Sequence, residues 1–322
     1  MTTQMIEPLY QLDVLGSGYE QATLNFPDDY EGQVTATLVR KKAQQTTKKA
    51  VLYIHGFIDY FFQSEMAEQF NQHGFDFYAL DLRKYGRSHL PHQHYYNVHE
   101  ITEYDAEITQ ALDIIAAENH DAVLLCGHSM GGLITTLYAA HHPNHPLIQA
   151  LWVNSPFYDF NINPIKKKIG LPNLSRVGKI CPDLKFPSEL NKWYVSSLHK
   201  SLKGEWDFNL DWKPAAYPWV RLSFIRTIFE AQKEIHQGVS LSIPTLVMHS
   251  HQTKKPKKWH ADIKSSDVIL DVKHIHHYAK KMKGDVTIQE IKNGLHDLVL
   301  SEKSVRETVY QQLFDWLKHK GF

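Results

Sequence analysis

The sequence predicts an α/β protein built on one mostly parallel sheet, with helices on both faces and an inserted domain. Short continuous apolar runs alternate with stretches of helical periodicity, which is typical of βαβ units in a sheet buried on both faces. Between residues 155 and 242 the alternation fails, and it resumes afterwards. We therefore expect a first core part at 1–154, an inserted domain at 155–242, and a second core part at 243–322.

The first core part opens with two runs, 19–25 and 34–40, that are bounded by Pro, Asp or Gly and predict antiparallel edge strands. A continuous apolar strand at 50–54 then ends at His55-Gly56. Residues 62–73 follow with helical spacing until Gly74 stops the helix. The same reasoning predicts, in the order strand, helix, strand, helix, strand, the elements 75–80, 102–119, 122–126, 131–142 and 148–153.

The inserted domain differs in composition from the core, with scattered Pro and Gly and a basic run at 166–168. Its aromatic side chains include Trp193, Tyr194, Trp206, Phe208, Trp212 and Trp219. A small module must bury such residues to fold, and we expect some of them to face a cleft as an apolar lid. After it, the sequence predicts strands at 244–248 and 286–291 and helices at 272–282 and 305–318.

Composition excludes several classes of protein. The 35 Lys and Arg residues balance 35 Asp and Glu residues, so no global field attracts nucleic acid or another polyanion. Two cysteines cannot build a disulfide framework and fit a reducing compartment. The sequence has neither a signal-peptide pattern nor an apolar window of about 18 residues. We expect a cytoplasmic protein with no transmembrane segment, compatible with peripheral membrane contact.

The strongest chemical signal is the pentapeptide Gly127-His128-Ser129-Met130-Gly131, which fits the G-x-S-x-G pattern. It lies between a predicted strand and a predicted helix, so a tight turn would expose the Ser129 hydroxyl at the sheet edge. The helix N-terminus would then offer the Met130 N–H to a developing oxyanion. Ser129 is therefore the candidate nucleophile, and we expect the neighbouring His128 to point away from it and pack.

A serine nucleophile needs an imidazole base and a carboxylate that orients the base. His296 is the candidate base, because it lies in the loop after the last predicted strand, on the sheet edge that also carries Ser129. The acid is expected after the strand at 244–248. We favour Asp267 over Asp271, whose alternative role is to begin the next helix, and Asp262 also lies in this loop.

Together these features resemble the α/β-hydrolase superfamily, in its lysophospholipase and monoacylglycerol-lipase-like branch of the serine aminopeptidase S33 type. The residues that carry the resemblance are Ser129, Asp267 and His296 in this order, His55-Gly56-Phe57, and the stretch 81–88. The sequence departs from the family pattern twice. Lys84 replaces a usual glycine, and the loop that holds the acid has an extra stretch at 250–265.

The resemblance implies a nucleophile at Ser129, an oxyanion hole formed by the N–H groups of Phe57 and Met130, and a cap formed by the inserted domain. We expect a serine hydrolase that cleaves carboxylic esters of lipid-like substrates, such as monoacylglycerol or lysophospholipid, through an acyl-enzyme. Other reactions of a serine nucleophile, on thioesters, peptides or C–C bonds, are alternatives. A catalytically silent binding module is the alternative outside the enzymes.

No organic cofactor or metal is needed for this chemistry, and we expect neither. The sequence does contain closely spaced histidine pairs, at His92/His94, His141/His142, His249/His251 and His276/His277. They are spread over separate elements and lack both neighbouring cysteines and the helical spacing of known zinc motifs. The basic run 254–258 is interpreted as a solvated loop, with a phosphate headgroup as its alternative contact.

Overall fold

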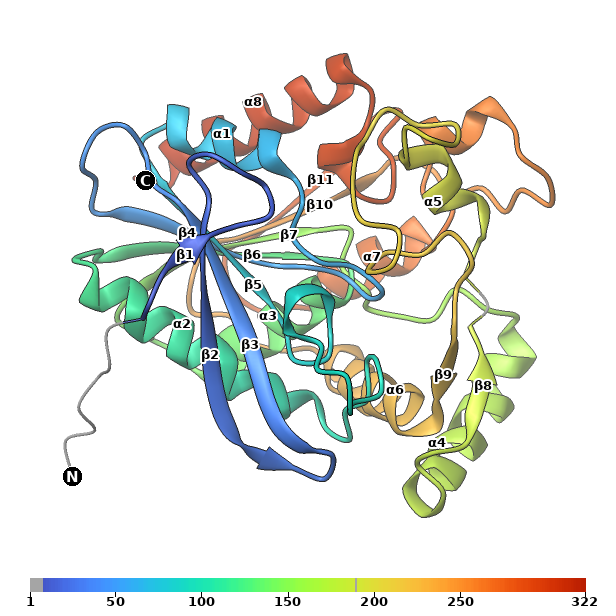
Figure 1. Ribbon diagram of the computed structural model, residues 1–322. Helices are drawn as coiled ribbons and strands as arrows, with labels where there is room; N and C mark the ends of the chain where they lie inside the picture. The colour runs from blue at the N-terminus through green and yellow to red at the C-terminus, as the bar shows by residue number, and fades with distance from the viewer. Residues whose placement is uncertain (1–7, 189) are drawn as a thin grey trace.

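The computed structural model describes residues 8–188 and 190–322. Within these residues a nine-stranded sheet runs through the centre, in the order β1-β2-β3-β5-β4-β6-β7-β10-β11 (Figure 1). The strands of this sheet are β1 (Gln11–Leu12), β2 (Glu20–Asp29), β3 (Gly32–Lys41), β4 (Lys49–Ile54), β5 (Asp76–Asp81), β6 (Ala122–His128), β7 (Ile148–Asn154), β10 (Thr245–Ser250) and β11 (Val286–Ile291). From β5 to β11 all neighbours are parallel, whereas β1, β2 and β3 pair antiparallel.

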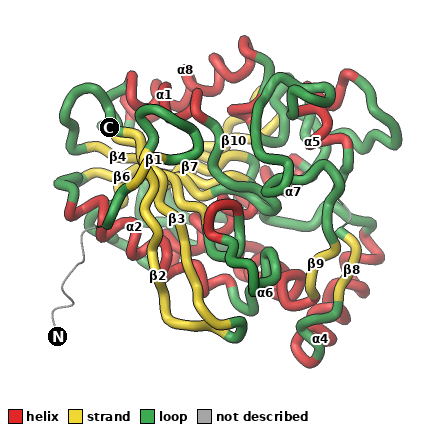
Figure 2. The backbone as a smooth tube through the Cα atoms, viewed as in Figure 1, coloured by secondary structure: helices red, strands yellow, loops and turns green. Residues whose placement is uncertain are grey.

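Helices cover both faces of the sheet (Figure 2). One face is covered by α1 (Ser64–Gln72) and α8 (Lys303–His319). The other is covered by α2 (Asp105–Ala117), α3 (Met130–His141), α6 (Leu222–Gln237) and α7 (Val272–Ala279). None of the helices in the described ranges has both the length and the apolarity to cross a bilayer.

Strand β4 shows why the central strands are continuously apolar. Val51 and Tyr53 join the core beneath α1 and α8, while Ala50 and Leu52 join the core on the opposite face. Because successive side chains of a strand point to opposite faces, a sheet covered twice has no solvent-facing positions here. The predicted fold class, with its parallel sheet and two helical layers, is confirmed.

Three of the predicted elements need correction. The run 19–25 belongs to β2, which lies between the short strand β1 and β3, and is therefore not an edge strand. The run 34–40 belongs to β3, which pairs with β5 as well as β2 and is not an edge strand either. Its central residues are buried on both sides, which explains the apolar character that the antiparallel pattern alone does not require. The predicted helix at 102–119 begins with a 3₁₀ turn at Ile101–Tyr104 before α2 starts.

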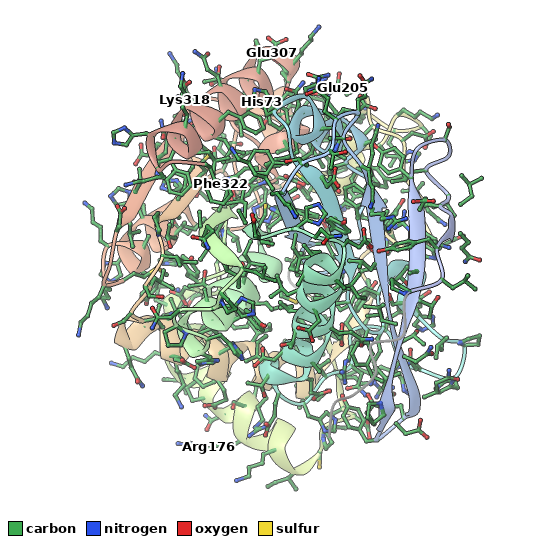
Figure 3. All side chains as sticks on the ribbon, turned by 90° about the vertical axis from the view of Figure 1, so that its left-hand side faces the viewer. His73, Arg176, Glu205, Glu307, Lys318 and Phe322 are labelled. Carbon is green, nitrogen blue, oxygen red and sulfur yellow. The ribbon has the colours of Figure 1, made fainter. Side chains whose placement is uncertain are left out.

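The segment 155–242, here called the inserted segment, leaves the sheet after β7 and returns before β10, although these two strands are direct neighbours. Besides α6 it contains a π-helical turn (Lys166–Gly170), α4 (Leu171–Ile180), α5 (Trp193–Leu198) and a small sheet of β8 (Lys185–Pro187) and β9 (Trp219–Arg221). Figure 3 shows Arg176 of α4 at one end of the molecule and Lys318 of α8 at the opposite end.

Lys84, at the usual glycine position, adopts a left-handed backbone with φ of 65°. Its side chain is fully buried, and its Nζ lies 2.7 Å from both Asp29 Oδ2 and Glu31 Oε2 at the β2–β3 turn. Burial alone would raise the pKa of Glu31, but hydrogen bonds from Lys84 and His94 lower this pKa to about 2. The ion pairs provide partners for the buried ammonium group and attach the hairpin to the loop after β5.

Candidate active site

Ser129 lies at the sharp turn between β6 and α3, with φ of 53° and ψ of −114°. The turn requires the glycines that flank it. A Cβ on Gly127 would lie 2.3 Å from the Gly131 carbonyl oxygen, and one on Gly131 would lie 2.2 Å from the Ile54 carbonyl oxygen. Strand, turn and helix are therefore packed too closely for any side chain at these two positions, which is the physical basis of the G-x-S-x-G pattern.

The structure brings Ser129, His296 and Asp267 together in one hydrogen-bonded chain. His296 Nε2 lies 3.0 Å from Ser129 Oγ, and His296 Nδ1 lies 2.8 Å from Asp267 Oδ2. The other carboxylate oxygen, Oδ1, accepts the backbone N–H groups of Ile269 at 2.8 Å and Leu270 at 2.7 Å. Three donors, the two backbone N–H groups at Oδ1 and the imidazole N–H at Oδ2, hold both oxygens of this carboxylate, so its orientation is fixed.

The two other candidate acids lie elsewhere. Asp271 caps the N-terminus of α7, where it accepts the Lys273 N–H at 3.0 Å. Asp262 pairs with Lys254 in an exposed loop, and the hydrogen bond from Lys254 lowers the pKa of Asp262. Among the hydrogen bonds of the described residues, only Asp267 joins His296 to a carboxylate.

The extra stretch at 250–265 does not displace Asp267, because the two ends of this loop are hydrogen-bonded to each other. The Asp267 N–H donates to the Gln252 carbonyl at 3.0 Å, and the Lys254 N–H donates to the Asp267 carbonyl at 2.9 Å. These two hydrogen bonds close the base of the loop, so the length of the loop does not change the position of Asp267 relative to the His296 imidazole. The basic run 254–258 lies in this loop with Lys255, Lys257 and Lys258 exposed.

A second buried carboxylate, Asp297, anchors the loop that carries His296. Its Oδ1 accepts from Asn154 Nδ2 at 2.7 Å and its Oδ2 accepts from Gln63 Nε2 at 3.1 Å. The Asn154 amide oxygen accepts the Leu298 N–H at 3.2 Å in return. Sequence reasoning missed Asp297, and its position directly after His296 was the available signal.

The loop after β4 presents the backbone of Phe57 beside Ser129. The Leu82 N–H donates to His55 Nε2 at 3.1 Å, so the proton of this imidazole is on Nδ1, which donates to the Gly56 carbonyl at 2.7 Å. The next residue, Ile58, has φ of 52°. His55 thereby locks the loop to the end of β5. The N–H groups of Phe57 and Met130 donate to no carbonyl within the described ranges.

His128 does not point away from the site, so that expectation is wrong. It lines the same cavity as Ser129, and its ring centroid lies 4.8 Å from that of His296. Its Nδ1–H donates a hydrogen bond to the Asn154 carbonyl oxygen at 3.1 Å. Burial lowers the pKa of His128 to about 4, so the ring is neutral at physiological pH. It therefore does not compete with His296 for the proton of Ser129.

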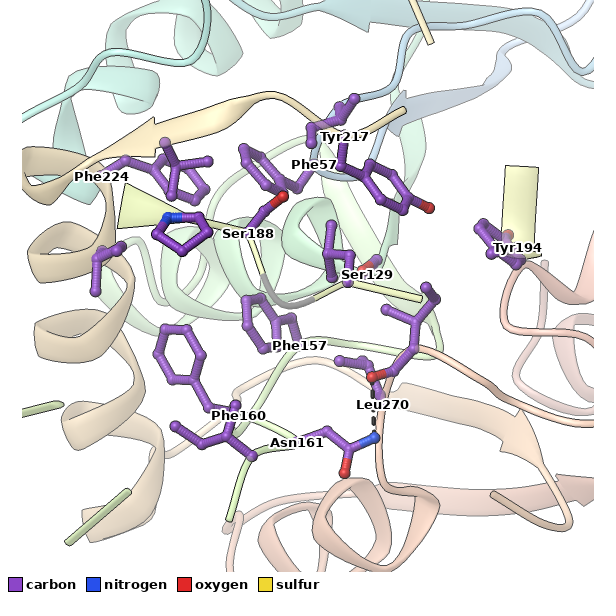
Figure 4. Close-up of a pocket in the computed structure, with 18 of the residues that line it drawn as sticks. Phe57, Ser129, Phe157, Phe160, Asn161, Ser188, Tyr194, Tyr217, Phe224 and Leu270 are labelled. Atoms are coloured by element: carbon purple, nitrogen blue, oxygen red, sulfur yellow. Dashed lines mark hydrogen bonds between the residues drawn. The ribbon is translucent and has the colours of Figure 1, made fainter. Parts of the chain in front are cut away.

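A cavity of about 300 Å³ opens above Ser129, between the core and the inserted segment. Figure 4 shows Ser129 with Phe57 and Tyr217 on one side and Phe157 on the other. Phe57 stacks on Phe224 of α6, with ring centroids 4.3 Å apart. The lining is mainly apolar, so the cavity suits a hydrocarbon chain better than a polar group.

One buried ion pair joins the inserted segment to the loop beside Ser129. Lys213 Nζ lies 2.7 Å from Asp59 Oδ1, and the two side chains are only 4% and 2% exposed. Both residues line the cavity. This contact could not be predicted from the sequence, because Lys213 and Asp59 are far apart in the chain and neither belongs to a motif. The pair fixes the inserted segment over the cavity at its polar end.

Replacing Lys213 with Met should lower the free energy of unfolding by about 3–5 kcal/mol, because it leaves the Asp59 carboxylate buried without a cation. Urea denaturation measures the change. The double variant Lys213→Met/Asp59→Asn removes both charges and should recover most of the loss. A single variant within about 1 kcal/mol of the parent, or a double variant with no recovery, would show that the pair does not fix the segment.

The family model described as serine aminopeptidase, S33 matches residues 45–304. A curated relative, the AB hydrolase superfamily protein YisY of Bacillus subtilis (strain 168), is 21% identical over 211 residues, which cover 64% of this chain and 75% of YisY. Among solved structures, a soluble variant of monoglyceride lipase from Saccharomyces cerevisiae has a TM-score of 0.68 at 17% identity and covers 99% of this chain and 97% of that one. Monoacylglycerol lipase of Paleococcus ferrophilus has a TM-score of 0.65 at 20% identity, covering 88% and 99%. The chain has the α/β-hydrolase fold and belongs to the serine aminopeptidase S33 family.

Proposed function

We propose that this protein is a serine hydrolase that cleaves carboxylic esters of lipid-like substrates, such as monoacylglycerol or lysophospholipid. The observation that carries the proposal is the hydrogen-bonded chain of Ser129, His296 and Asp267 beneath an apolar cavity. The names of the yeast and Paleococcus proteins, which are monoglyceride lipases, support the same substrate class.

In the proposed mechanism His296 Nε2 takes the Ser129 proton as Oγ attacks the ester carbonyl. The resulting imidazolium is stabilised by Asp267, which also holds the proton on Nδ1. His296 then gives the proton to the leaving alcohol, and an acyl group remains on Ser129. A water molecule, deprotonated by His296, attacks this acyl-enzyme, and His296 returns the proton to Ser129 Oγ as the bond to the acyl group breaks and the acid leaves.

The tetrahedral intermediate carries a negative oxygen that needs donors. The N–H groups of Phe57 and Met130 supply them, and Met130 adds the positive end of α3. Both groups are held before substrate arrives, Phe57 by the loop that His55 locks and Met130 by the strained turn at Ser129. Donors that are already oriented need no reorganisation when charge develops.

The inserted segment supplies a lid in this proposal. Its Phe157, Tyr217 and Phe224, together with Phe57 from the core side, surround the space above Ser129 (Figure 4). An apolar enclosure excludes water from the acyl-enzyme and binds the acyl chain. We also propose a reducing, cytoplasmic environment, which the two free thiols of Cys126 and Cys181 support.

A panel of p-nitrophenyl esters from acetate to laurate, with monoacylglycerol, lysophospholipid and aminoacyl anilide beside them, tests the substrate class. We expect kcat/KM to rise about threefold to fourfold per methylene until the cavity is filled, since each buried methylene contributes about 0.8 kcal/mol. The anilide should react poorly, because the cavity carboxylate that could bind a substrate ammonium, Asp59, is already paired with Lys213. A flat chain-length profile, or a preference for the anilide, would contradict the proposal.

A variant pair on α4 provides the control. Leu174 lines the cavity, so Leu174→Trp should shorten the preferred acyl chain. Val177 lies on the same helix but is 42% exposed and does not line the cavity, so Val177→Trp should leave the profile unchanged. Equal effects of both variants would place the acyl chain elsewhere.

A further inference from the structure

Two histidines and a glutamate that the mechanism does not use lie together beside α7. His249 is on β10, Glu290 is on the neighbouring strand β11, and His276 is on α7. One nitrogen of each ring and one carboxylate oxygen all lie within 4.8 Å of one another. None of the three residues is part of the described lining of the cavity above Ser129.

The fold explains why these side chains meet. His249 and Glu290 are direct partners in the parallel register of β10 and β11, so their side chains lie side by side on one sheet face. This is the face that α7 covers, through Ile275 and Ala279. His276, next to Ile275 on the helix, then reaches the same point from above, and its ring lies 5.7 Å from that of His249.

His249 is oriented as a metal ligand would be. Its side chain is buried, with the residue 1% exposed, and its Nδ1 lies 2.7 Å from the Ser250 carbonyl oxygen. A carbonyl accepts only from a protonated nitrogen, so Nε2 carries the free lone pair. Within the described ranges this buried Nε2 has no hydrogen-bond partner, and neither has the buried Nδ1 of His276. Buried polar atoms are seldom left without a partner.

We propose that His249 Nε2, His276 Nδ1 and a Glu290 carboxylate oxygen bind a Zn²⁺ ion, with water completing a tetrahedral site. Two imidazoles and a carboxylate are a ligand set that zinc accepts. The backbone carbonyl that fixes the His249 tautomer is the outer-shell partner that ligating histidines usually have.

The distances require only a small adjustment. Ligand atoms around tetrahedral zinc lie about 3.3–3.5 Å apart, and His276 Nδ1 is already 3.7 Å from Glu290 Oε1. The side chains of His276 and Glu290 are 33% and 56% exposed, so both can rotate toward the fixed nitrogen of His249. An ion here would link β10, β11 and α7 where the strand leads into the loop that holds Asp267.

The paired histidines in the sequence did not predict this site, because the ligands are not a pair. His249 and His276 come from two different pairs, and only the packing of α7 on the sheet brings one member of each to Glu290. His251 and His277, the other members, are not among the three residues of the cluster.

Titration of metal-free protein with Zn²⁺ by calorimetry tests the site, with Co²⁺ as the spectroscopic substitute. We expect one strong site per chain, visible absorption typical of tetrahedral Co²⁺, and a higher Tm with Zn²⁺. Glu290→Gln and His276→Asn, at partly exposed positions that tolerate substitution, should each weaken Zn²⁺ binding at least tenfold.

His277→Asn is the matched control, since it removes an exposed histidine from the same helix and should leave binding unchanged. Circular dichroism of each variant separates loss of the ligand from loss of the fold. The proposal is overturned if Zn²⁺ does not bind to the parent protein, if Glu290→Gln and His276→Asn bind it as the parent does, or if His277→Asn is equally impaired.

Discussion

Ser129→Ala is expected to lower kcat for ester hydrolysis by a factor on the order of 10⁴–10⁶ and to abolish labelling by a fluorophosphonate probe. The hydroxyl is the atom that would form the acyl-enzyme, and His296 Nε2 at 3.0 Å is placed to take its proton. Alanine also fits the turn, because it removes only Oγ at a residue whose backbone is held by its neighbours. Labelling followed by mass spectrometry, with a kinetic assay on the best ester, measures both effects.

Ser188→Ala is the matched control, because Ser188 lines the same cavity and its hydroxyl donates to the Pro218 carbonyl at 3.0 Å rather than to an imidazole. It should be labelled like the parent. Labelling that survives Ser129→Ala would move the nucleophile to another residue. A parent protein that the probe does not label would favour the alternative of a catalytically silent binding module.

Asp267→Asn should lower kcat about 10⁴-fold with little change in KM, the second largest effect we expect. An amide in place of the carboxylate can no longer stabilise the imidazolium, and its NH₂ group favours the tautomer with the proton on Nε2, the nitrogen that faces Ser129. Steady-state kinetics of the parent, Asp267→Asn and Asp271→Asn on one ester measures the effect.

Asp271→Asn is the comparison, since the sequence alone left this residue as the other acid. Asn is also a good helix cap, so α7 should keep its N-terminus and kcat should stay within about twofold of the parent. A result in the reverse order, with Asp271→Asn inactive and Asp267→Asn active, would reassign the acid.

The sequence predicted the structure correctly where local geometry restricts which residue types can occupy a position. The continuous apolar run of β4 follows from burial on both faces, and the glycines around Ser129 follow from backbone contacts that allow no Cβ. Both patterns are short and can be recognised without knowing which distant residues they contact. The structure also brings Asp267 and His296 to Ser129, and their catalytic roles stay predictions until the variants are measured.

Contacts between distant segments were not predictable in this way. The Lys213–Asp59 pair joins the inserted segment to the loop after β4, and nothing local to either residue indicates it. Lys84 looked like a departure from a glycine pattern, yet two acidic residues of the β2–β3 turn pair with its buried ammonium group. Similarly, His128 lines the cavity beside Ser129, which the local sequence pattern does not indicate.

Helix α6 limits how the inserted segment of this protein could be exchanged with that of a relative. The helix lies within the inserted segment, but its Leu222, Ile228 and Ile235 are packed in the same core as α2 and α3. A graft that replaced all of 155–242 would therefore remove one of the four helices on that side of the sheet. A chimera joined before Leu222 keeps this helix, and the donor sequence then has to match the side of α6 on which α4 packs and the core loop that holds Asp59.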